Sequence, residues 1–416
     1  MPELKIAKFR GLNNVQDPAE AGKGDLQVAT NVDVNDVGGL KMRLGSMRLY
    51  SGAPHSLMSD GTDLLFREGT DLKRFDPTDQ TTEVLQTGFT EDLELAHVHL
   101  NHSLYFSDGV TSGVYQDRRA RSLGLAVPSA VGLARIAGTL LAGRYHVHVT
   151  YVRADGQESG ASTAAWLDLV SAGGLRVTLA PSSDADVSSI NVYVSTPHGE
   201  RVYLQATAPN QAGAVDVTDR WSLGRGRSCR TIHMGPMPAG TLLEFYRGRL
   251  YMANGPLLWV SELFKYELCS FDHGLLMFPG DITMLTALEN GIWLGTTRGT
   301  QFLYGRDIHQ QGGFDVRGRL DSYPPLRTAV RTDGENMPEW LRLASGQVAV
   351  WPTSEGIMIG DREGTVKNFT GDRWVAPDGA AGTGFINDLP GSAQYLFGIL
   401  GTPGQGSGNV RVTINQ

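Results

Sequence analysis

Histidine pairs are the residues of this sequence whose spacing most resembles that of metal ligands. His97 and His99 form one His-x-His pair, with His102 three residues further on, and His146 and His148 form another. On a β-strand, residues i and i+2 point to the same face, so each pair could direct two imidazoles toward one ion. Spacing assigns no third or fourth ligand, and the valine inside each pair fits a strand with one buried face. We therefore expect histidines on polar strand faces and no metal site.

Carboxylates are the second group that could do chemistry. Asp281, Glu289 and Asp307 could supply the pair of acids that a glycosidase uses, but nothing in the sequence brings two of them together. The run Ser59-Asp60-Gly61-Thr62 resembles the aspartate box of sialidase propellers, which is a structural turn, although the downstream tryptophan of that box is missing. Among 44 acidic residues, isolated carboxylates are mostly solvated, so we expect no catalytic pair.

Neither the cysteines nor the common catalytic motifs indicate an active site. Cys229 and Cys269 have no neighbouring base, so we expect both to be buried as small hydrophobic residues. Two cysteines cannot form a disulfide framework, which fits folding in a reducing cytoplasm. The sequence contains no phosphate-binding glycine loop, no Gly-x-Ser-x-Gly elbow and no His-Glu-x-x-His motif. We expect a protein that is not an enzyme, without catalytic, metal-binding or cofactor-binding residues and without a cofactor.

The charge balance limits the possible partners. Lysine and arginine number 36 against 44 acidic residues, which gives a net charge of −8 and argues against tight, sequence-independent binding to nucleic-acid phosphates. No apolar run approaches the roughly 18 residues that a membrane helix needs, and the N-terminus lacks a signal-peptide pattern. Local basic spots are expected to be solvated or interface faces; they are Lys41, Arg43, Arg48 and Arg118-Arg119-Ala120-Arg121.

The elements that carry these residues have the pattern of short β-strands. Glycine accounts for 52 of 416 residues, and short apolar runs alternate with Asn-Gly, Asp-Gly and similar turns, which are typical of β-hairpins. Helical periodicity is nearly absent, and residues 259–268 are the one candidate helix. The repeated central strands begin at Leu64, Leu104, Leu250, Ile292, Ile357 and Tyr395. Their regular spacings of 40, 42 and 38 residues predict an all-β fold with a β-propeller of about six blades.

The gap between the second and third repeats is too long for one blade. It spans 146 residues, which leaves about 100 residues for a further domain. Short alternating strands in this insert predict a β-sandwich, with strands at Gly143–Arg153, Ala164–Leu169, Gly174–Leu179, Ser189–Thr196 and Arg201–Ala206. The runs Leu141-Ala142-Gly143-Arg144-Tyr145 and Asp155-Gly156-Gln157-Glu158-Ser159 resemble those of fibronectin type III-like domains of surface and phage proteins.

The expected organisation therefore has four consecutive segments. Residues 1–52 form an N-terminal arm and the opening strands of the propeller, and residues 53–126 form its first blades. Residues 127–227 form the inserted, immunoglobulin-like or fibronectin III-like sandwich, and residues 228–416 form the remaining blades. The arm around Asn13–Gly24 and a long loop at Asp307–Pro325 lack a regular repeat, so we expect both to become ordered on a neighbouring subunit.

The N-terminal segment carries a further resemblance. Phe9-Arg10-Gly11-Leu12-Asn13-Asn14 precedes the strand-like run Leu26–Val34, which is followed by Gly38-Gly39-Leu40, Arg43 and Gly45. This segment resembles the opening of a family of bacteriophage virion proteins, in which Asn-Val-Asp precedes a Gly-x-Leu-x-x-Arg-x-Gly turn. The family is that of the tail nozzle, or tail tubular, proteins of short-tailed phages. Its members carry a β-propeller, often with a sandwich or fibronectin-like insertion, and assemble as a hexameric ring below the portal and adaptor.

The resemblance implies a structural virion protein of the phage tail, made in the host cytoplasm. As a homohexameric nozzle ring it would continue the DNA channel, retain the genome and bind the adaptor or head-to-tail connector and the tail fibres or spikes. DNA would pass without sequence-specific binding, and the negative charge of the chain would keep DNA from adhering. Two alternatives stay open: a receptor-binding or tail-tip (baseplate) protein whose sandwich recognises host glycans, and a propeller glycosidase.

Overall fold

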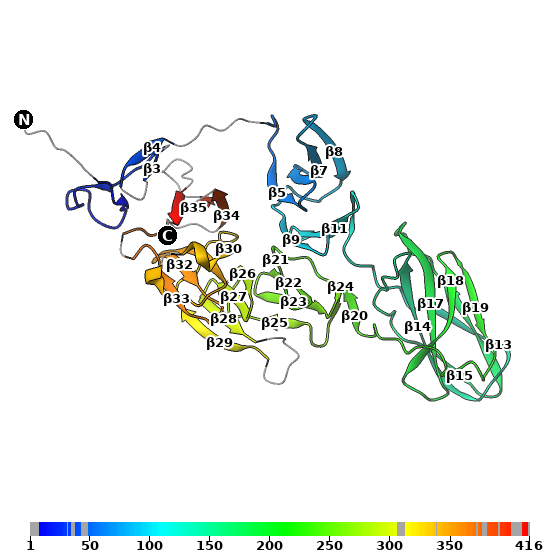
Figure 1. Ribbon diagram of the computed structural model, residues 1–416. Helices are drawn as coiled ribbons and strands as arrows, with labels where there is room; N and C mark the ends of the chain where they lie inside the picture. The colour runs from blue at the N-terminus through cyan, green and yellow to red at the C-terminus, as the bar shows by residue number, and fades with distance from the viewer. Residues whose placement is uncertain are drawn as a thin grey trace, which may run out of the picture. The chain divides into compact units, whose positions relative to one another are not determined.

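The computed structural model describes residues 8–30, 32–34, 38–42, 49–305, 313–337, 339–371, 373–376, 381–389, 392–400 and 410–414. Regular structure in these residues consists of β-strands and two short 3-10 helices, η1 (Gly334–Asn336) and η2 (Glu339–Leu341). None of the helices among them is long and apolar enough to cross a bilayer. The chain divides into two compact units (Figure 1), the first comprising Met1–Val110, Ala239–Leu258 and Met277–Gln416, the second Thr111–Pro238 and Trp259–Leu276.

The first unit contains successive antiparallel sheets in which each strand pairs with the next one along the chain. Four-stranded sheets are formed by β5–β8, β26–β29 and β30–β33, a three-stranded sheet by β34–β36, and hairpins by β9–β10 and β21–β22. Their bounds are β5 (His55–Ser59), β6 (Leu64–Glu68), β7 (Asp71–Asp76), β8 (Thr81–Gln86), β9 (Ala96–Leu100), β10 (Ser103–Ser107), β21 (Leu242–Tyr246), β22 (Arg249–Asn254), β26 (Ile282–Leu288), β27 (Gly291–Thr296), β28 (Gly299–Tyr304), β29 (Asp315–Leu320), β30 (Val330–Asp333), β31 (Gln347–Thr353), β32 (Gly356–Gly360), β33 (Val366–Asn368), β34 (Ala381–Leu389), β35 (Ser392–Leu400) and β36 (Val410–Ile414).

Neighbouring sheets of the first unit meet through their first or second strands. Strand β5 contacts β9, β9 contacts β21, β21 contacts β26, β26 contacts β31, and β30 contacts β34. Meandering sheets that follow one another in this way are the blades of a β-propeller. The described part of this unit holds six such sheets or hairpins in succession, so the predicted all-β propeller fold is confirmed.

Aromatic side chains fill the space between two neighbouring blades. Trp293 in β27 and Trp351 in β31 are inaccessible to solvent, and their ring centroids lie 5.1 Å apart. The indole N–H of Trp293 donates a hydrogen bond to the carbonyl oxygen of Asp361 at 3.0 Å, so this polar atom is satisfied inside the core. Burying side chains of this size stabilises the packing by roughly 1.5–3 kcal/mol each.

The turn at Asn101-His102 has the backbone that a tight hairpin requires. Both residues have positive φ values, 50° and 61°, and Leu100 pairs directly with Ser103 across the turn. Two consecutive left-handed residues match the right-handed twist of the strands they join. Asparagine tolerates this conformation better than most residues, which explains why the sequence signal located the hairpin correctly.

The N-terminal segment folds onto its own chain. Strands β1 (Gly11–Leu12) and β2 (Asp25–Leu26) pair in parallel, and β3 (Val32–Val34) and β4 (Leu40–Met42) form a hairpin. The Asn14 amide donates to the carbonyl of Val375 at 2.9 Å and accepts from its N–H at 3.0 Å. Arg373 lies 2.6 Å from the Asp25 carboxylate. We expect from the sequence that the arm becomes ordered on a neighbouring subunit, but these contacts hold it on its own chain, so that expectation is wrong for this part of the arm.

The long loop expected at Asp307–Pro325 is shorter than predicted. Asp315–Leu320 forms β29, whose residues pair with β28 from Thr300 to Tyr304. Strand pairing satisfies the backbone of this stretch within its own blade, so it needs no neighbouring subunit to become ordered. Asp307 itself lies outside the described residues.

The inserted β-sandwich forms most of the second unit, and its fold is confirmed (Figure 1). One sheet has the order β15-β14-β17-β18 and the other β13-β16-β19. Their inner faces share a core that includes Tyr145, Val147 and Val149, as the strict alternation of that strand predicted. The bounds are β13 (Gly132–Leu140), β14 (Gly143–Arg153), β15 (Ala165–Leu169), β16 (Gly173–Leu179), β17 (Val187–Ser195), β18 (Val202–Pro209) and β19 (Gly213–Val217).

The second unit also contains strands outside the predicted segment 127–227. They are β11 (Ser112–Gln116), β12 (Arg119–Ser122), β20 (Met234–Pro236), β24 (Lys265–Ser270) and the larger parts of β23 (Leu257–Glu262) and β25 (Leu275–Met277), whose residues 257–258 and 277 belong to the first unit. Strands β23 and β24 pair antiparallel, so the helix considered for residues 259–268 is wrong. Leu258 and Val260 are both buried two residues apart, which is the period of a strand, and the chain reverses at Leu263-Phe264.

Candidate functional site

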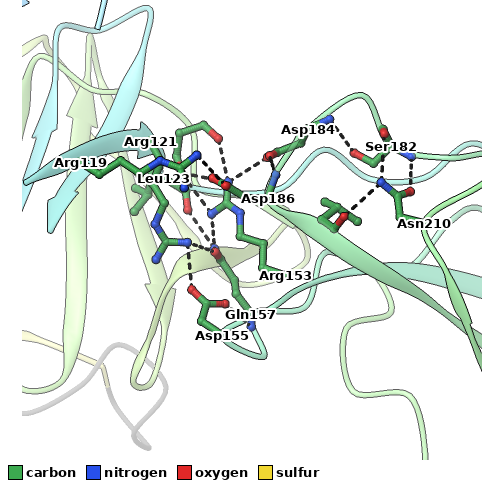
Figure 2. A network of polar contacts seen from close by, with 12 residues as sticks. Arg119, Arg121, Leu123, Arg153, Asp155, Gln157, Ser182, Asp184, Asp186 and Asn210 are labelled. Carbon is green, nitrogen blue, oxygen red and sulfur yellow. Dashed lines mark hydrogen bonds and ion pairs between the residues drawn. The ribbon is translucent and has the colours of Figure 1, made fainter. Parts of the chain in front are cut away.

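A buried arginine joins the sandwich to the β11–β12 hairpin inside the second unit (Figure 2). Arg153 lies at the end of β14, and its side chain is 1% exposed. Its guanidinium donates to the carboxylate of Asp184 and to the hydroxyl of Ser122, both at 2.9 Å, and also to the side-chain oxygen of Gln157. Charge-assisted hydrogen bonds of this kind are stronger than neutral ones, so one side chain holds three segments together.

Two further arginines of β12, the exposed Arg119 and the half-buried Arg121, continue this junction. Arg119 lies 2.7 Å from the Asp186 carboxylate, and Arg121 lies 3.0 Å from that of Asp155 (Figure 2). The amide of Gln157 donates to the backbone carbonyl of Leu123 at 2.9 Å. The basic run predicted to be an interface or solvated face therefore contacts acidic loops of the sandwich within the same chain.

The loop that carries Asp184 is itself held in place. The amide of Asn210 accepts from the N–H of Ser182 at 2.8 Å and donates to the carbonyls of Ser182 and Val187, each at 3.2 Å (Figure 2). Asp184 also accepts from the N–H of Asp186 at 2.9 Å. Burial would raise the pKa of Asp184, but this backbone bond and the Arg153 guanidinium outweigh it and lower the pKa below its ordinary value.

A second polar cluster lies on the outer face of the β14–β17 pair. One oxygen of Glu158 accepts hydrogen bonds from Thr150 at 2.6 Å, from Tyr193 at 2.6 Å and from Asn191 at 3.0 Å. Its other oxygen lies 3.0 Å from Arg227. Burial acts to raise the pKa of Glu158, yet the three hydrogen bonds and the arginine together lower it, so the carboxylate stays ionised.

The chemistry of these two clusters is that of a structural junction. Burial and, to a smaller extent, the hydrogen bond to Glu158 raise the pKa of Tyr193. The phenol therefore stays protonated and acts as a hydrogen-bond donor. The Arg153, Asp184 and Glu158 side chains are each engaged by partners of the same unit. Such an arrangement fixes geometry and leaves no activated nucleophile or free general base in these two clusters.

The two His-x-His pairs lie on separate strands, β9 and β14, and His102 lies in the turn after β9. His97 and His99 are exposed on one face of β9. His148 is buried on β14, with its Nδ1 2.7 Å from the carbonyl of Ser162, and burial lowers its pKa. In the part of the chain that the structure describes, no group of three or more potential ligands is placed to hold a metal ion.

Two of the three carboxylates considered for a glycosidase, Asp281 and Glu289, are not brought together, and the third, Asp307, lies outside the described residues. Asp281 precedes β26 and Glu289 follows it, so an extended strand separates them by about 25 Å. Glycosidase pairs lie about 5–9.5 Å apart, so these two cannot act as one. Asp60 forms a turn instead: its carboxylate accepts from the N–H groups of Thr62 at 2.8 Å and Asp63 at 2.7 Å, like the turn of an aspartate box.

The cysteines and the remaining basic residues have ordinary surroundings. Burial raises the pKa of Cys269 to about 12 and also raises that of Cys229, so neither is a ready thiolate. Lys41 lies on the exposed strand β4, opposite Asp33 in register. Arg43 and Arg48 lie outside the described residues.

Sequence reasoning missed the junction, although one signal for it was present. The buried alternation of Tyr145, Val147, Val149 and Tyr151 continues to position 153, where an arginine stands. A charged residue in the buried register of a strand needs a buried partner, so the arginine at this position is a sequence signal for an internal ion pair. The identity of the partner, Asp184, depends on a loop 31 residues away that no sequence pattern locates.

The comparisons with known proteins support no assignment by family. No family model matches the chain, and no curated protein matches it. Solved propeller proteins resemble it weakly: BBS1N, crystallised in complex with ARL6DN, shares 11% identity over 88% of this chain and 92% of its own, with a TM-score of 0.34. The N-terminal domain of Nup159 shares 9% identity over 83% of this chain and 72% of its own, with a TM-score of 0.28. KlHsv2 with a Gly-Ser linker in place of loop 6CD shares 8% identity over 88% of this chain and 98% of its own, with a TM-score of 0.30. At these TM-scores the similarities carry no argument about function.

Proposed function

We propose that the chain is a structural virion protein of a tailed bacteriophage and that it forms a hexameric nozzle ring in the tail. The ring would continue the DNA channel, retain the packaged genome and bind the adaptor and the tail fibres or spikes. The proposal starts from the N-terminal motif and from the order of elements along the chain, which is blades, an inserted sandwich and further blades.

The observation that carries the proposal is the Arg153 junction. Arg153, the last residue of the sandwich strand β14, forms hydrogen bonds to β12 and to the loop at Asp184 within one compact unit. A subunit of a conduit under the pressure of packaged DNA needs rigid parts, and this buried charge network holds the sandwich to the β11–β12 hairpin of the same unit. The net charge of −8 also suits a surface past which DNA must slide without adhering.

Particles assembled without the chain provide the test. In a phage that encodes it, an amber codon in its gene would be compared in suppressing and non-suppressing hosts. A nozzle subunit predicts that non-suppressed heads fill but lose their DNA, so that the genome becomes sensitive to nuclease, and that no fibres attach. Particles that keep their DNA and fail only to adsorb to cells would contradict the proposal and favour the receptor-binding alternative.

A further inference from the structure

An exposed tryptophan stands beside an ion pair on the outer face of the sandwich sheet. Trp166 and Asp168 alternate on the edge strand β15, and they pair in register with His146 and Arg144 of β14. The indole of Trp166 is 56% exposed, although it is one of the largest apolar side chains in the sequence. An aromatic surface in water beside fixed polar side chains can act as a stacking platform for a ligand ring.

The ion pair fixes the indole and the polar groups around it. Arg144 donates to both carboxylate oxygens of Asp168, at 2.9 Å and 2.8 Å, and its guanidinium carbon lies 4.3 Å from the centroid of the Trp166 ring. A bidentate pair with a cation–π contact holds three side chains in one geometry. Arg144 lowers the pKa of Asp168, with smaller contributions from His198 and His146, so the carboxylate is ionised and the two imidazoles lie in its neighbourhood.

The charge of this group limits the ligand that it can take. The carboxylate neutralises the guanidinium, so the group offers no net positive charge to a phosphate or a sulfate. Side-chain exposures of 47% for both Arg144 and Asp168 leave hydrogen-bonding atoms in contact with solvent. An aromatic face beside neutralised planar donors and acceptors suits a neutral ring that has a C–H face and several hydroxyl groups.

We propose that Trp166, Arg144, Asp168 and His146 form a binding site for a neutral saccharide. The C–H face of a pyranose would lie on the indole face that the Arg144 guanidinium leaves open, while its hydroxyl groups exchange hydrogen bonds with the carboxylate and the imidazole beside the ring. This site is independent of the nozzle assignment, since a sandwich could bind saccharide on a nozzle or on a receptor-binding protein.

Fluorine NMR of the full chain labelled with 5-fluorotryptophan tests the site. The protein has seven tryptophans, and the resonance missing from the Trp166→Phe variant identifies Trp166. The probes would be neutral oligosaccharides of glucose, galactose, mannose and N-acetylglucosamine. We expect at least one to shift the Trp166 resonance saturably. Asp168→Asn should weaken this binding about tenfold or more, because it removes a charged acceptor.

Trp221 is the matched control. It is 61% exposed and also has an arginine, Arg220, at 4.3 Å from its ring, but among the described residues Arg220 forms no ion pair. Its resonance should stay unchanged at saccharide concentrations that saturate Trp166. The proposal is overturned if no saccharide shifts Trp166, if Trp221 shifts in parallel, or if only a single-stranded oligothymidylate shifts it, because the last result would assign base stacking.

Discussion

Arg153 and Asp184 form an ion pair in which the arginine side chain is 1% exposed and the carboxylate 27% exposed. The 2.9 Å contact joins the end of β14 to the loop before β17. Because the arginine also holds Ser122, loss of its acidic partner affects both the sandwich and the β12 hairpin.

The first prediction concerns the stability of this junction. Replacing Asp184 by Ala leaves a buried guanidinium without its carboxylate, so the free energy of unfolding should fall by about 1–3 kcal/mol. Urea denaturation measures the change, and hydrogen exchange should locate increased opening in β12 and the end of β14.

The pair Arg176–Asp216 supplies the control for this experiment. Its members lie 2.6 Å apart in a bidentate contact, but they are 51% and 40% exposed. Asp216→Ala should therefore cost only about 0–1 kcal/mol. Equal losses of unfolding free energy in Asp184→Ala and Asp216→Ala would contradict the prediction, because they would show that the buried Arg153 does not need the Asp184 carboxylate.

The second prediction is a pH dependence that comes from Glu158. The pKa of Glu158 is lowered in the folded protein from the ordinary value of 4.5. Its contribution to stability is therefore complete above the pKa of the unfolded state, and it is lost as the pH falls through the pKa of the folded state. The stability difference between the wild type and Glu158→Gln should therefore be largest near neutral pH and shrink below about pH 4.5. Urea midpoints measured from pH 7 to pH 3 would reveal it.

The exposed Glu200 provides the comparison for the pH series. Glu200→Gln should leave the stability profile parallel to that of the wild type. A Glu158→Gln difference that stays constant from neutral to acidic pH would contradict the assignment, because an uncharged packing effect does not titrate.

The third prediction concerns the turn between β23 and β24. Phe264 has a φ of 57°, in the left-handed region, and its side chain is 72% exposed. Phe264→Gly relieves this conformation and loses little buried surface, so we expect an unfolding free energy higher by about 0.5–1 kcal/mol. Leu263 does not have a positive φ, so Leu263→Gly should be destabilising instead. Destabilisation by both variants in thermal unfolding would contradict the turn geometry.

Strict patterns made some elements predictable from the sequence and left others hidden. The alternation from Tyr145 to Tyr151 located β14 with its bounds, Gly143–Arg153. In contrast, β13 and β19 were not predicted, since Gly132–Leu140 is rich in glycine and alanine and Gly213–Val217 is short. Residues 259–268 are a candidate helix in the sequence because their apolar residues fit more than one period, but the burial of Leu258 and Val260 has the period of a strand.

The candidate sites were less predictable than the fold. Spacing along one strand correctly placed His97 and His99 on one face, but the Arg153 junction and the Trp166 group each combine residues from separate strands or loops. Their partners are set by strand register and loop conformation, which follow from tertiary packing and have no local signature.

The symmetry of the chain in the phage particle tests the central claim most directly. Heterologous contacts between identical subunits close into a ring when the rotation allows it, so a nozzle subunit should appear as several copies around the tail axis. Electron microscopy of the particle that contains the chain, with a localised reconstruction of the tail, would count them. The account predicts a six-fold ring attached to the adaptor, and a single copy or a three-fold spike at the tail tip would contradict it.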